Sequence, residues 1–156
     1  MAAITMPSIS WLVKQLIKDF PQFSFKPSQK FLWSPTDKTI LYNTTKPHAK
    51  ELLLHELSHG ILNHDKYQRD VELINIEQSA WQRAAELALR YNITIDDNFI
   101  QTNLDSYRDW LHARSACPSC KASGLQVAKA VYQCVACNQT WRVNNAKTCA
   151  LRRYKL

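Results

Sequence analysis

The strongest chemical signal in the sequence is a pair of histidines that flank a glutamate. His55, Glu56 and His59 form a His-Glu-x-x-His pattern within KPHAKELLLHELSHGILNHDK. On a helix, residues four positions apart lie about 5–6 Å from each other on one face, so both imidazoles can hold one metal ion. Glu56 would then lie beside that ion, where it can accept a proton from metal-bound water. The pattern predicts a catalytic zinc site with Glu56 as the catalytic base.

The residues around this motif predict the helix that it needs. Thr45 is a residue type that caps helices, and Pro47 suits a first helical turn. Apolar residues recur at helical spacing through the segment and predict a buried stripe: Ala49, Leu52, Leu53, Leu57, Ile61 and Leu62.

A catalytic zinc ion takes three protein ligands and keeps one position for water, so a third ligand is required. The segment VELINIEQSAWQRAAELALRY predicts a second long helix, on which Glu77 shares a side with Ala80 and Ala84. A carboxylate that points into an apolar interface is costly unless it is paired or binds a metal. We therefore expect Glu77 to be the third ligand, with Glu86 as the alternative.

The remaining histidines are weaker candidates. His64 follows His59 by five residues, where a continued helix has turned most of the way around. It is also one residue short of the third histidine in the extended His-Glu-x-x-His-x-x-Gly-x-x-His pattern, and Asp65 occupies that position. We expect a surface or helix-terminal role for His64, and solvated or structural roles for His48 and His112.

Four of the five cysteines form a second metal-binding pattern. Cys117 and Cys120 make one Cys-x-x-Cys pair, and Cys134 and Cys137 make another after 13 intervening residues. This spacing is typical of a four-thiolate structural zinc site; the alternative, two disulfides or redox pairs, requires an oxidising compartment or a thioredoxin-like setting. The β-prone residues nearby predict a zinc ribbon, whose small core depends on the metal for stability. Cys149 is left without a role.

Charge is divided unevenly along the chain. All 13 acidic residues precede residue 110, together with 12 of the 20 basic ones, whereas residues 113–156 hold the other eight basic residues and no acid. Such asymmetry indicates a segment whose partner is an anion, nucleic acid above all; the alternative is a solubilising tail. The expected partners are a protein substrate and nucleic acid at the C-terminal segment.

Composition limits the remaining possibilities. The chain has 156 residues, of which 46% are hydrophobic and 21% charged, which is typical of a globular protein. No apolar run reaches the roughly 18 residues of a membrane span, and the N-terminus lacks the basic start of a signal peptide, so we expect a cytoplasmic protein without a membrane partner. Only two glycines occur, which excludes glycine-rich phosphate loops. The sequence leaves the oligomeric state open.

These elements predict an α+β fold with two domains. Residues 1–112 would form a helical zincin-like metallopeptidase domain with a small antiparallel sheet, and residues 113–156 the four-cysteine zinc ribbon and basic tail. Within the first domain we expect a helix near residues 10–20, short strands punctuated by prolines, the two site helices, and a third helix that runs to about residue 113.

The run from TILYN through HELSHGILNH to IEQSAWQRAAELA resembles the ImmA/IrrE family of bacterial and phage zinc metallopeptidases. Glu77, Ala80 and Ala84 match the family's Glu-x-x-Ala-x-x-Phe-Ala-like segment, although Arg83 stands where the family usually has an aromatic residue. The resemblance covers roughly residues 30–95. It implies a compact gluzincin-like fold and the cleavage of proteins, often transcriptional repressors of mobile elements.

Three functions follow from these patterns. The first is a zinc endopeptidase that acts on a protein, such as a DNA-bound regulator. The second is a SprT-like protease for DNA-linked proteins, since those proteases also join a His-Glu-x-x-His core to a ribbon; they use a downstream third histidine, however, and none lies between residues 65 and 111. The third is a non-enzymatic nucleic-acid-binding protein on a zincin scaffold, which would have no need for Glu56 as a base.

Overall fold

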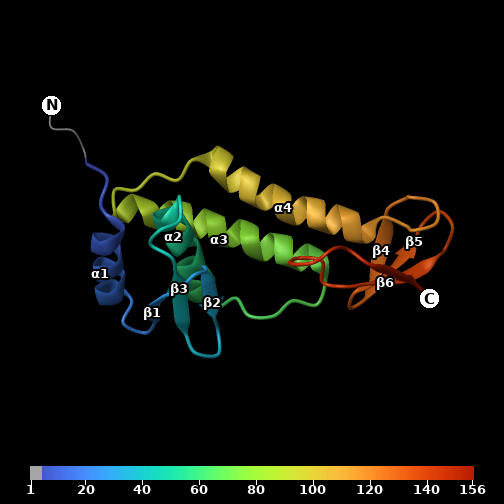
Figure 1. The fold of residues 1–156 in the computed structure, drawn as a ribbon, viewed down its shortest axis with the longest axis horizontal. Helices are drawn as coiled ribbons and strands as arrows, with labels where there is room; N and C mark the ends of the chain where they lie inside the picture. The colour runs from blue at the N-terminus through green and yellow to red at the C-terminus, as the bar shows by residue number, and fades with distance from the viewer. Residues whose placement is uncertain (1–4) are drawn as a thin grey trace. The chain divides into compact units, whose positions relative to one another are not determined.

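The computed structural model describes residues 5–156, and the first four residues of the predicted N-terminal domain lie outside this range. The chain divides into two compact units (Figure 1). The N-terminal unit comprises the residues up to Asp65 together with Ile76–Ile100, and the ribbon unit comprises Lys66–Asn75 with Gln101–Leu156. The division falls within two long helices, α3 (Asp70–Arg90) and α4 (Asp97–Ser115). The predicted domains 1–112 and 113–156 assign these helices differently and stay a prediction.

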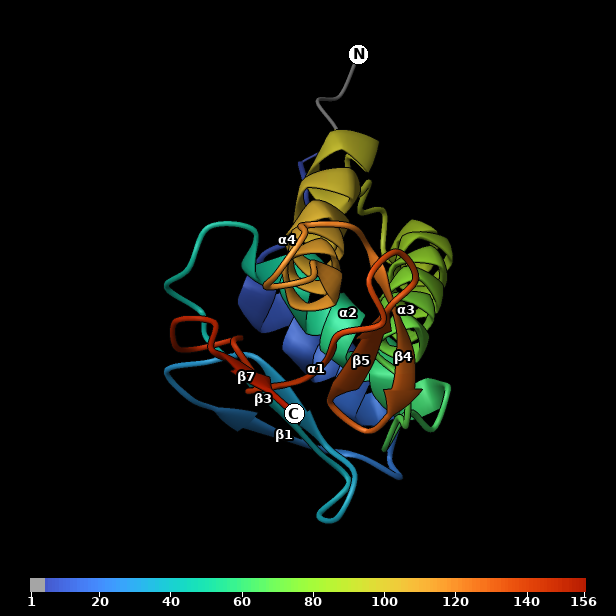
Figure 2. The ribbon, with the colours of Figure 1, turned by 90° about the vertical axis from the view of Figure 1, so that its right-hand side faces the viewer.

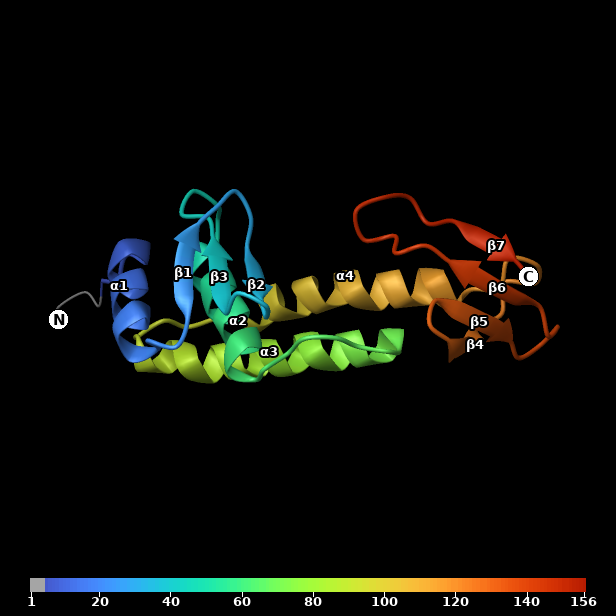
Figure 3. The same ribbon diagram turned by 90° about the horizontal axis from the view of Figure 1, so that it is seen from below.

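The N-terminal unit confirms the predicted α+β class. Its other helices are α1 (Ile9–Asp19) and α2 (Ala49–Ile61), and its strands are β1 (Ser24–Pro27), β2 (Leu32–Ser34) and β3 (Thr39–Tyr42). The three strands lie in the order β1-β3-β2 (Figure 3). β2 pairs with β3 in the antiparallel direction, whereas β1 pairs with β3 in the parallel direction. β2 is therefore an edge strand.

Local sequence explains how the first helix forms. The Ser8 side chain accepts a hydrogen bond from the Trp11 backbone N–H at 3.1 Å, which caps the start of α1. Burial of Leu12, Val13 and Leu16 then gives α1 one apolar face. The most buried apolar side chains of this unit come from α1, α2, α3, β3 and the loop after α3: Leu12, Leu16, Ile40, Leu53, Leu54, Leu57, Ala80, Trp81, Ala84, Leu87, Ala88 and Ile93.

The start of α2 differs from the sequence prediction. Thr45 does not cap the helix, because its backbone N–H and hydroxyl both donate to the Asn43 side chain, at 2.9 and 2.7 Å. The helix begins at Ala49, after His48 in a left-handed backbone conformation. Three residues, among them Pro47, therefore separate Thr45 from the helix that carries the His-Glu-x-x-His motif.

The end of α2 is a Schellman turn, a motif that closes a helix and reverses the chain. Asn63 takes the left-handed conformation with φ of 55° and donates from its N–H to the Gly60 carbonyl at 3.1 Å. The His64 N–H donates to the His59 carbonyl at 2.9 Å. Asparagine tolerates this conformation better than most residues, which explains why the helix ends here.

The ribbon unit contains an antiparallel sheet of four strands in the order β4-β5-β6-β7. They are β4 (Gly124–Ala128), β5 (Val131–Cys134), β6 (Thr140–Val143) and β7 (Arg153–Lys155). Figure 2 shows β4 and β5 side by side. The buried core is small and consists of Cys117, Tyr132, Cys134, Trp141 and Val143. At Gly124 an added Cβ would lie 2.5 Å from the Trp141 ring and 2.9 Å from the Gln133 carbonyl oxygen, so only glycine fits there.

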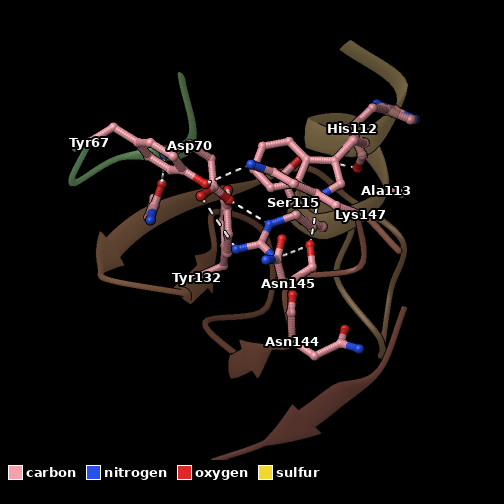
Figure 4. A network of polar contacts seen from close by, with 12 residues as sticks. Tyr67, Asp70, His112, Ala113, Ser115, Tyr132, Asn144, Asn145 and Lys147 are labelled. Atoms are coloured by element: carbon pink, nitrogen blue, oxygen red, sulfur yellow. Dashed lines mark hydrogen bonds and ion pairs between the residues drawn. The ribbon is translucent and has the colours of Figure 1, made fainter. Parts of the chain in front are cut away.

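A buried ion pair joins the start of α3, the end of α4 and this sheet. The Asp70 carboxylate accepts hydrogen bonds from Arg114 Nε at 2.7 Å and from the Tyr132 hydroxyl at 2.6 Å (Figure 4). Arg114 also donates to the backbone carbonyls of Asn144 and Asn145. Each partner of the pair is therefore both neutralised and hydrogen-bonded, as buried charges require.

None of the helices among residues 5–156 is long and apolar enough to cross a membrane.

Candidate metal centres

Three predicted ligands converge in the N-terminal unit. The Nε2 atoms of His55 and His59 are 3.1 Å apart, and they lie 3.0 and 3.4 Å from the two carboxylate oxygens of Glu77. The side chains come from adjacent turns of α2 and from α3. All three residues are almost completely buried, with 5%, 8% and 6% of their surface exposed.

These distances match the donor set of a zinc ion. Zinc–nitrogen and zinc–oxygen bonds of about 2.0–2.2 Å in a tetrahedral site put neighbouring ligand atoms about 3.3–3.6 Å apart. The observed separations of 3.0–3.4 Å are close to those edges. Two imidazoles and one carboxylate also form a known catalytic ligand set, which keeps a fourth position for water. The group is therefore compatible with zinc.

The electrostatics of Glu77 favour its charged form. Burial alone would raise the pKa of the carboxyl, but hydrogen bonds and charge interactions with His55 and His59 outweigh burial and lower the pKa to about 2. An ionised carboxylate is the form that binds a metal ion. Glu77 therefore places a negatively charged carboxylate between two imidazoles.

His55 is held by ring packing. Its imidazole stacks on the Trp81 indole with the ring centroids 4.1 Å apart and the planes 23° from parallel. Trp81 in turn meets the ring of Phe99 edge to face at 5.5 Å. The His55 Nδ1 atom is buried and has no hydrogen-bond partner among the described residues. Glu77 holds the Nε2 side of this ring, whereas aromatic contact takes the place of a polar partner on the Nδ1 side.

His59 is held by a hydrogen-bonded chain. Its Nδ1 atom lies 2.9 Å from Nδ1 of His64, and His64 Nε2 lies 3.3 Å from the Ser79 hydroxyl on α3. Sequence reasoning missed this contact because it continued α2 past Ile61, whereas the Schellman turn folds His64 back onto the helix. Asn63 was the available signal, since asparagine favours the left-handed position of such a turn.

Glu56 lies next to the three converging ligands but is hydrogen-bonded elsewhere. Its Oε2 atom accepts the Trp33 backbone N–H of the edge strand β2 at 2.8 Å. Burial raises the pKa of the Glu56 carboxyl, and the nearby His55 and His59 together with the Trp33 N–H offset part of that rise. The Trp33 indole N–H also donates to the His64 carbonyl at 2.9 Å, so one residue of β2 binds both the predicted base and the turn after α2.

Four cysteines converge in the ribbon unit, as their spacing predicts. The Sγ atoms of Cys117 and Cys137 are 3.7 Å apart, and those of Cys120 and Cys134 are 3.4 Å apart. Zinc–sulfur bonds of about 2.3 Å give tetrahedral edges of about 3.8 Å, so this group is also compatible with zinc.

Backbone hydrogen bonds act on the Cys134 sulfur of this group. The N–H groups of Cys137 and Ala136 both donate to the Cys134 Sγ atom at 3.4 Å, and they lower the pKa of this thiol. A lowered pKa favours the thiolate, which is the form that ligates zinc. All five cysteines of the chain are free.

The alternative ligands lie elsewhere. Glu86 forms a 3.3 Å ion pair with Arg83 on the surface of α3. His48 stacks on Phe99 with ring centroids 4.2 Å apart, and His112 is exposed. Within residues 5–156 the only clusters of three or more ligand side chains are the His55–His59–Glu77 group and the four cysteines. Cys149 is exposed and belongs to neither.

Comparison with protein-family models, with curated proteins and with solved structures finds no match to this chain. The geometry of the two centres therefore carries the argument for function.

Proposed function

We propose that the N-terminal unit is a zinc-dependent endopeptidase and that the four cysteines of the ribbon unit hold a structural zinc ion. The observation that supports this most strongly is the position of Glu56 beside the His55–His59–Glu77 group, with its carboxylate fixed by the Trp33 N–H. A purely structural site of three ligands has no need of a fourth, separately oriented carboxylate. Two histidines, one acidic ligand and an adjacent glutamate are the parts that metal-assisted peptide hydrolysis requires.

The proposed mechanism assigns roles to the three metal ligands, to Glu56 and to the Trp33 backbone N–H. His55, His59 and Glu77 would hold a zinc ion here, which would supply Lewis acidity to lower the pKa of a water to about 7 and to polarise the scissile carbonyl. Glu56 accepts the proton of the attacking water and later delivers it to the leaving amine. Its raised pKa brings the carboxyl closer to the pH at which it must both accept and release that proton. The Trp33 N–H restrains one carboxylate oxygen, so that the other is available for the proton.

His64 acts as a positioning residue for His59 in this proposal. If His59 ligates through Nε2, its neutral ring must carry the remaining proton on Nδ1. His59 Nδ1 then donates to His64 Nδ1 across the 2.9 Å contact, and the His64 proton lies on Nε2, facing the Ser79 hydroxyl. Ser79 in turn donates to the Ile76 carbonyl at 2.9 Å, which completes a chain with one consistent direction. Such partners fix the orientation of a metal ligand.

The proposed substrate class is a protein, as the resemblance to the ImmA/IrrE family implies, and a DNA-bound regulator is the form that the basic ribbon segment favours. The position of Glu77 supports this reading over a SprT-like protease, because a glutamate from α3 takes the place that a third histidine has in those enzymes. The hydrogen bond between Trp33 and Glu56 supports it over a non-enzymatic role, since a binding module needs no oriented base.

The test is cleavage by the zinc-loaded chain and by its Glu56→Gln variant. Both proteins are incubated with a library of proteome-derived peptides, new termini are identified by mass spectrometry, and zinc per chain is measured. We expect cleavage by the wild-type chain and a loss of at least about 100-fold in the variant, because general acid–base catalysis contributes about 10²–10⁴-fold. Both proteins should contain the same amount of zinc.

Glu51→Gln is the matched control, since Glu51 lies on the same helix and pairs with His48 at its start. It should leave cleavage unchanged. Equal cleavage by the wild type and by Glu56→Gln, or no zinc-dependent cleavage by any of the three proteins, would contradict the proposal.

A further inference from the structure

The sheet of the ribbon unit has one buried face and one open face. Strand register places Val131 opposite Arg142, and Arg142 opposite Tyr154. Directly paired residues point to the same side of a sheet, so these three side chains form one row across β5, β6 and β7. Tyr132 and Trp141, which alternate with them, are buried in the core. The row therefore lies on the outward side, which we call the outer ribbon face.

A second row extends this face. Gln133 is paired with Leu125 of β4 and with Thr140 of β6, and both Leu125 and Gln133 are exposed. Tyr154 has 49% of its surface exposed, and Arg142 beside it is exposed as well. An aromatic ring and a guanidinium group thus stand next to each other on an open surface.

Most basic side chains of residues 113–156 make no ion pair. Arg114 is consumed by the buried pair with Asp70, and Lys147 lies over the rings of Tyr67 and Trp110, at 5.2 and 5.3 Å (Figure 4). Six other basic side chains are exposed and make no ion pair with any residue in the described range 5–156: Lys121, Lys129, Arg142, Arg152, Arg153 and Lys155. One of them, Arg153, donates a hydrogen bond to the Ala113 carbonyl. No acidic residue follows position 109 to neutralise them locally.

We propose that the outer ribbon face binds single-stranded nucleic acid, with Tyr154 stacking on a base and Arg142 contacting a backbone phosphate. Base stacking on an exposed aromatic side chain requires an unpaired base, which favours a single strand over a duplex. Free cations in a segment without acids supply the complementary charge. The face offers no helix that could enter a major groove, which is the usual way of reading duplex DNA.

This inference does not depend on peptidase activity, because binding and cleavage are measured separately. The probes are fluorescently labelled single-stranded DNA, single-stranded RNA and duplex DNA of mixed sequence, about 15 nucleotides long to cover one site. Their affinity for the full zinc-loaded chain is measured by anisotropy across a salt series. We expect the single strands to bind more tightly than the duplex, with an affinity that falls steeply as salt rises.

Two variants identify the face. Tyr154→Ala should lower single-strand affinity at least about fivefold, whereas Tyr154→Phe, which keeps the ring, should bind like the wild type. Arg142→Ala should weaken binding to all sequences alike and reduce the slope of log affinity against log salt by about one. Lys14→Ala is the matched control, since Lys14 is an exposed cation on α1 of the N-terminal unit. Zinc content and circular dichroism establish that each variant is folded.

Several outcomes would overturn the proposal. They are equal effects of Arg142→Ala and Lys14→Ala, unchanged binding by Tyr154→Ala, tighter binding to the duplex, or no measurable binding of any probe at low salt. The last result would leave the exposed Leu125 as part of a surface for a protein partner, a different role for the same face.

Discussion

The two candidate metal centres of this chain differ in what surrounds the ligands. In the N-terminal unit, three ligands come from two helices that already share an extensive apolar core, and a fourth carboxylate stands beside them. In the ribbon unit, four sulfurs make up the ligand set, and two of the cysteines are themselves part of a five-residue core. With a tetrahedral zinc ion, the first group would leave one position for water, whereas the second would fill the coordination sphere.

The difference has an energetic side. The helices of the N-terminal unit share a larger buried apolar core, so we expect this unit to stay folded when no metal is bound. The buried core of the ribbon unit has only five residues, so we expect zinc bound by the four cysteines to contribute directly to its folding. We therefore expect loss of metal to unfold the ribbon unit and to leave the N-terminal unit folded.

The largest expected effect is loss of the ribbon fold when one sulfur is removed. Cys134→Ser should expose the β5 and β6 amides to rapid hydrogen exchange while the α2 amides keep their protection, because thiolate–zinc bonds supply the folding energy of this sheet. A chelator that strips both centres should give the same pattern, with unfolding centred on residues 115–145. Hydrogen exchange measured by mass spectrometry distinguishes the two regions.

Cys149→Ser is the control for that experiment, since Cys149 is exposed and lies outside the cluster. It should leave the exchange pattern unchanged. Parallel loss of protection in α2 and in the ribbon strands would show that the two regions unfold as one body, and it would remove the energetic distinction between them.

The next effect concerns metal content. Glu77→Ala should lower bound zinc from two ions per chain to one, because two imidazoles alone lack the anionic third ligand. Glu86→Ala provides the matched comparison on the same helix, and it should keep both ions, since Glu86 pairs with Arg83 at the surface. Elemental analysis after dialysis measures the stoichiometry. Retention of both ions by Glu77→Ala would refute the ligand assignment.

A third effect tests how much the buried Asp70–Arg114 pair stabilises the ribbon unit. Asp70→Ala leaves the Arg114 guanidinium buried without its carboxylate, which should cost about 3–5 kcal/mol in the free energy of unfolding of this unit. The exposed Arg83–Glu86 pair is the comparison, and Glu86→Ala should cost less than about 1 kcal/mol. Urea unfolding followed by hydrogen exchange measures both, at the ribbon strands for Asp70→Ala and at the α2 amides for Glu86→Ala.

The double variant Asp70→Leu/Arg114→Met removes both charges at once. It should recover most of the stability lost in Asp70→Ala, because it leaves no unpaired charge in the interior. If Asp70→Ala alone were as stable as the wild type, the buried pair would not anchor the unit.

The smallest expected effect is on affinity at the histidine centre. His64→Ala should weaken zinc binding there by about 10–100-fold, because His59 loses the partner that fixes its ring and tautomer. Zinc competition titrations measure this directly, and the four-cysteine centre should be unaffected. His48→Ala is the control histidine, since its ring stacks on Phe99 away from the ligands. An unchanged zinc affinity in His64→Ala would reduce the contact with His59 to simple packing.

Local patterns were sufficient to predict both ligand sets. The four-residue spacing of His55 and His59 places two imidazoles on one helix face whatever else the chain does, and each Cys-x-x-Cys pair places two sulfurs within one turn. Glu77 could be predicted in the same way, because helical periodicity places it on one side with the small apolar residues Ala80 and Ala84. These predictions depend on contacts within one element or on the known period of a helix.

Only the tertiary structure decided which groups support those ligands. The Trp33 N–H reaches Glu56 across 23 residues, and Arg114 and Tyr132 reach Asp70 across 44 and 62. Such contacts depend on how strands and helices pack, and no spacing along the chain encodes them. His64 was predicted only in part. Its place in the sequence suggested a surface position, but the left-handed conformation of Asn63 brings it within 2.9 Å of the predicted ligand His59. Backbone direction at one position decided its role, which residue type alone could not do.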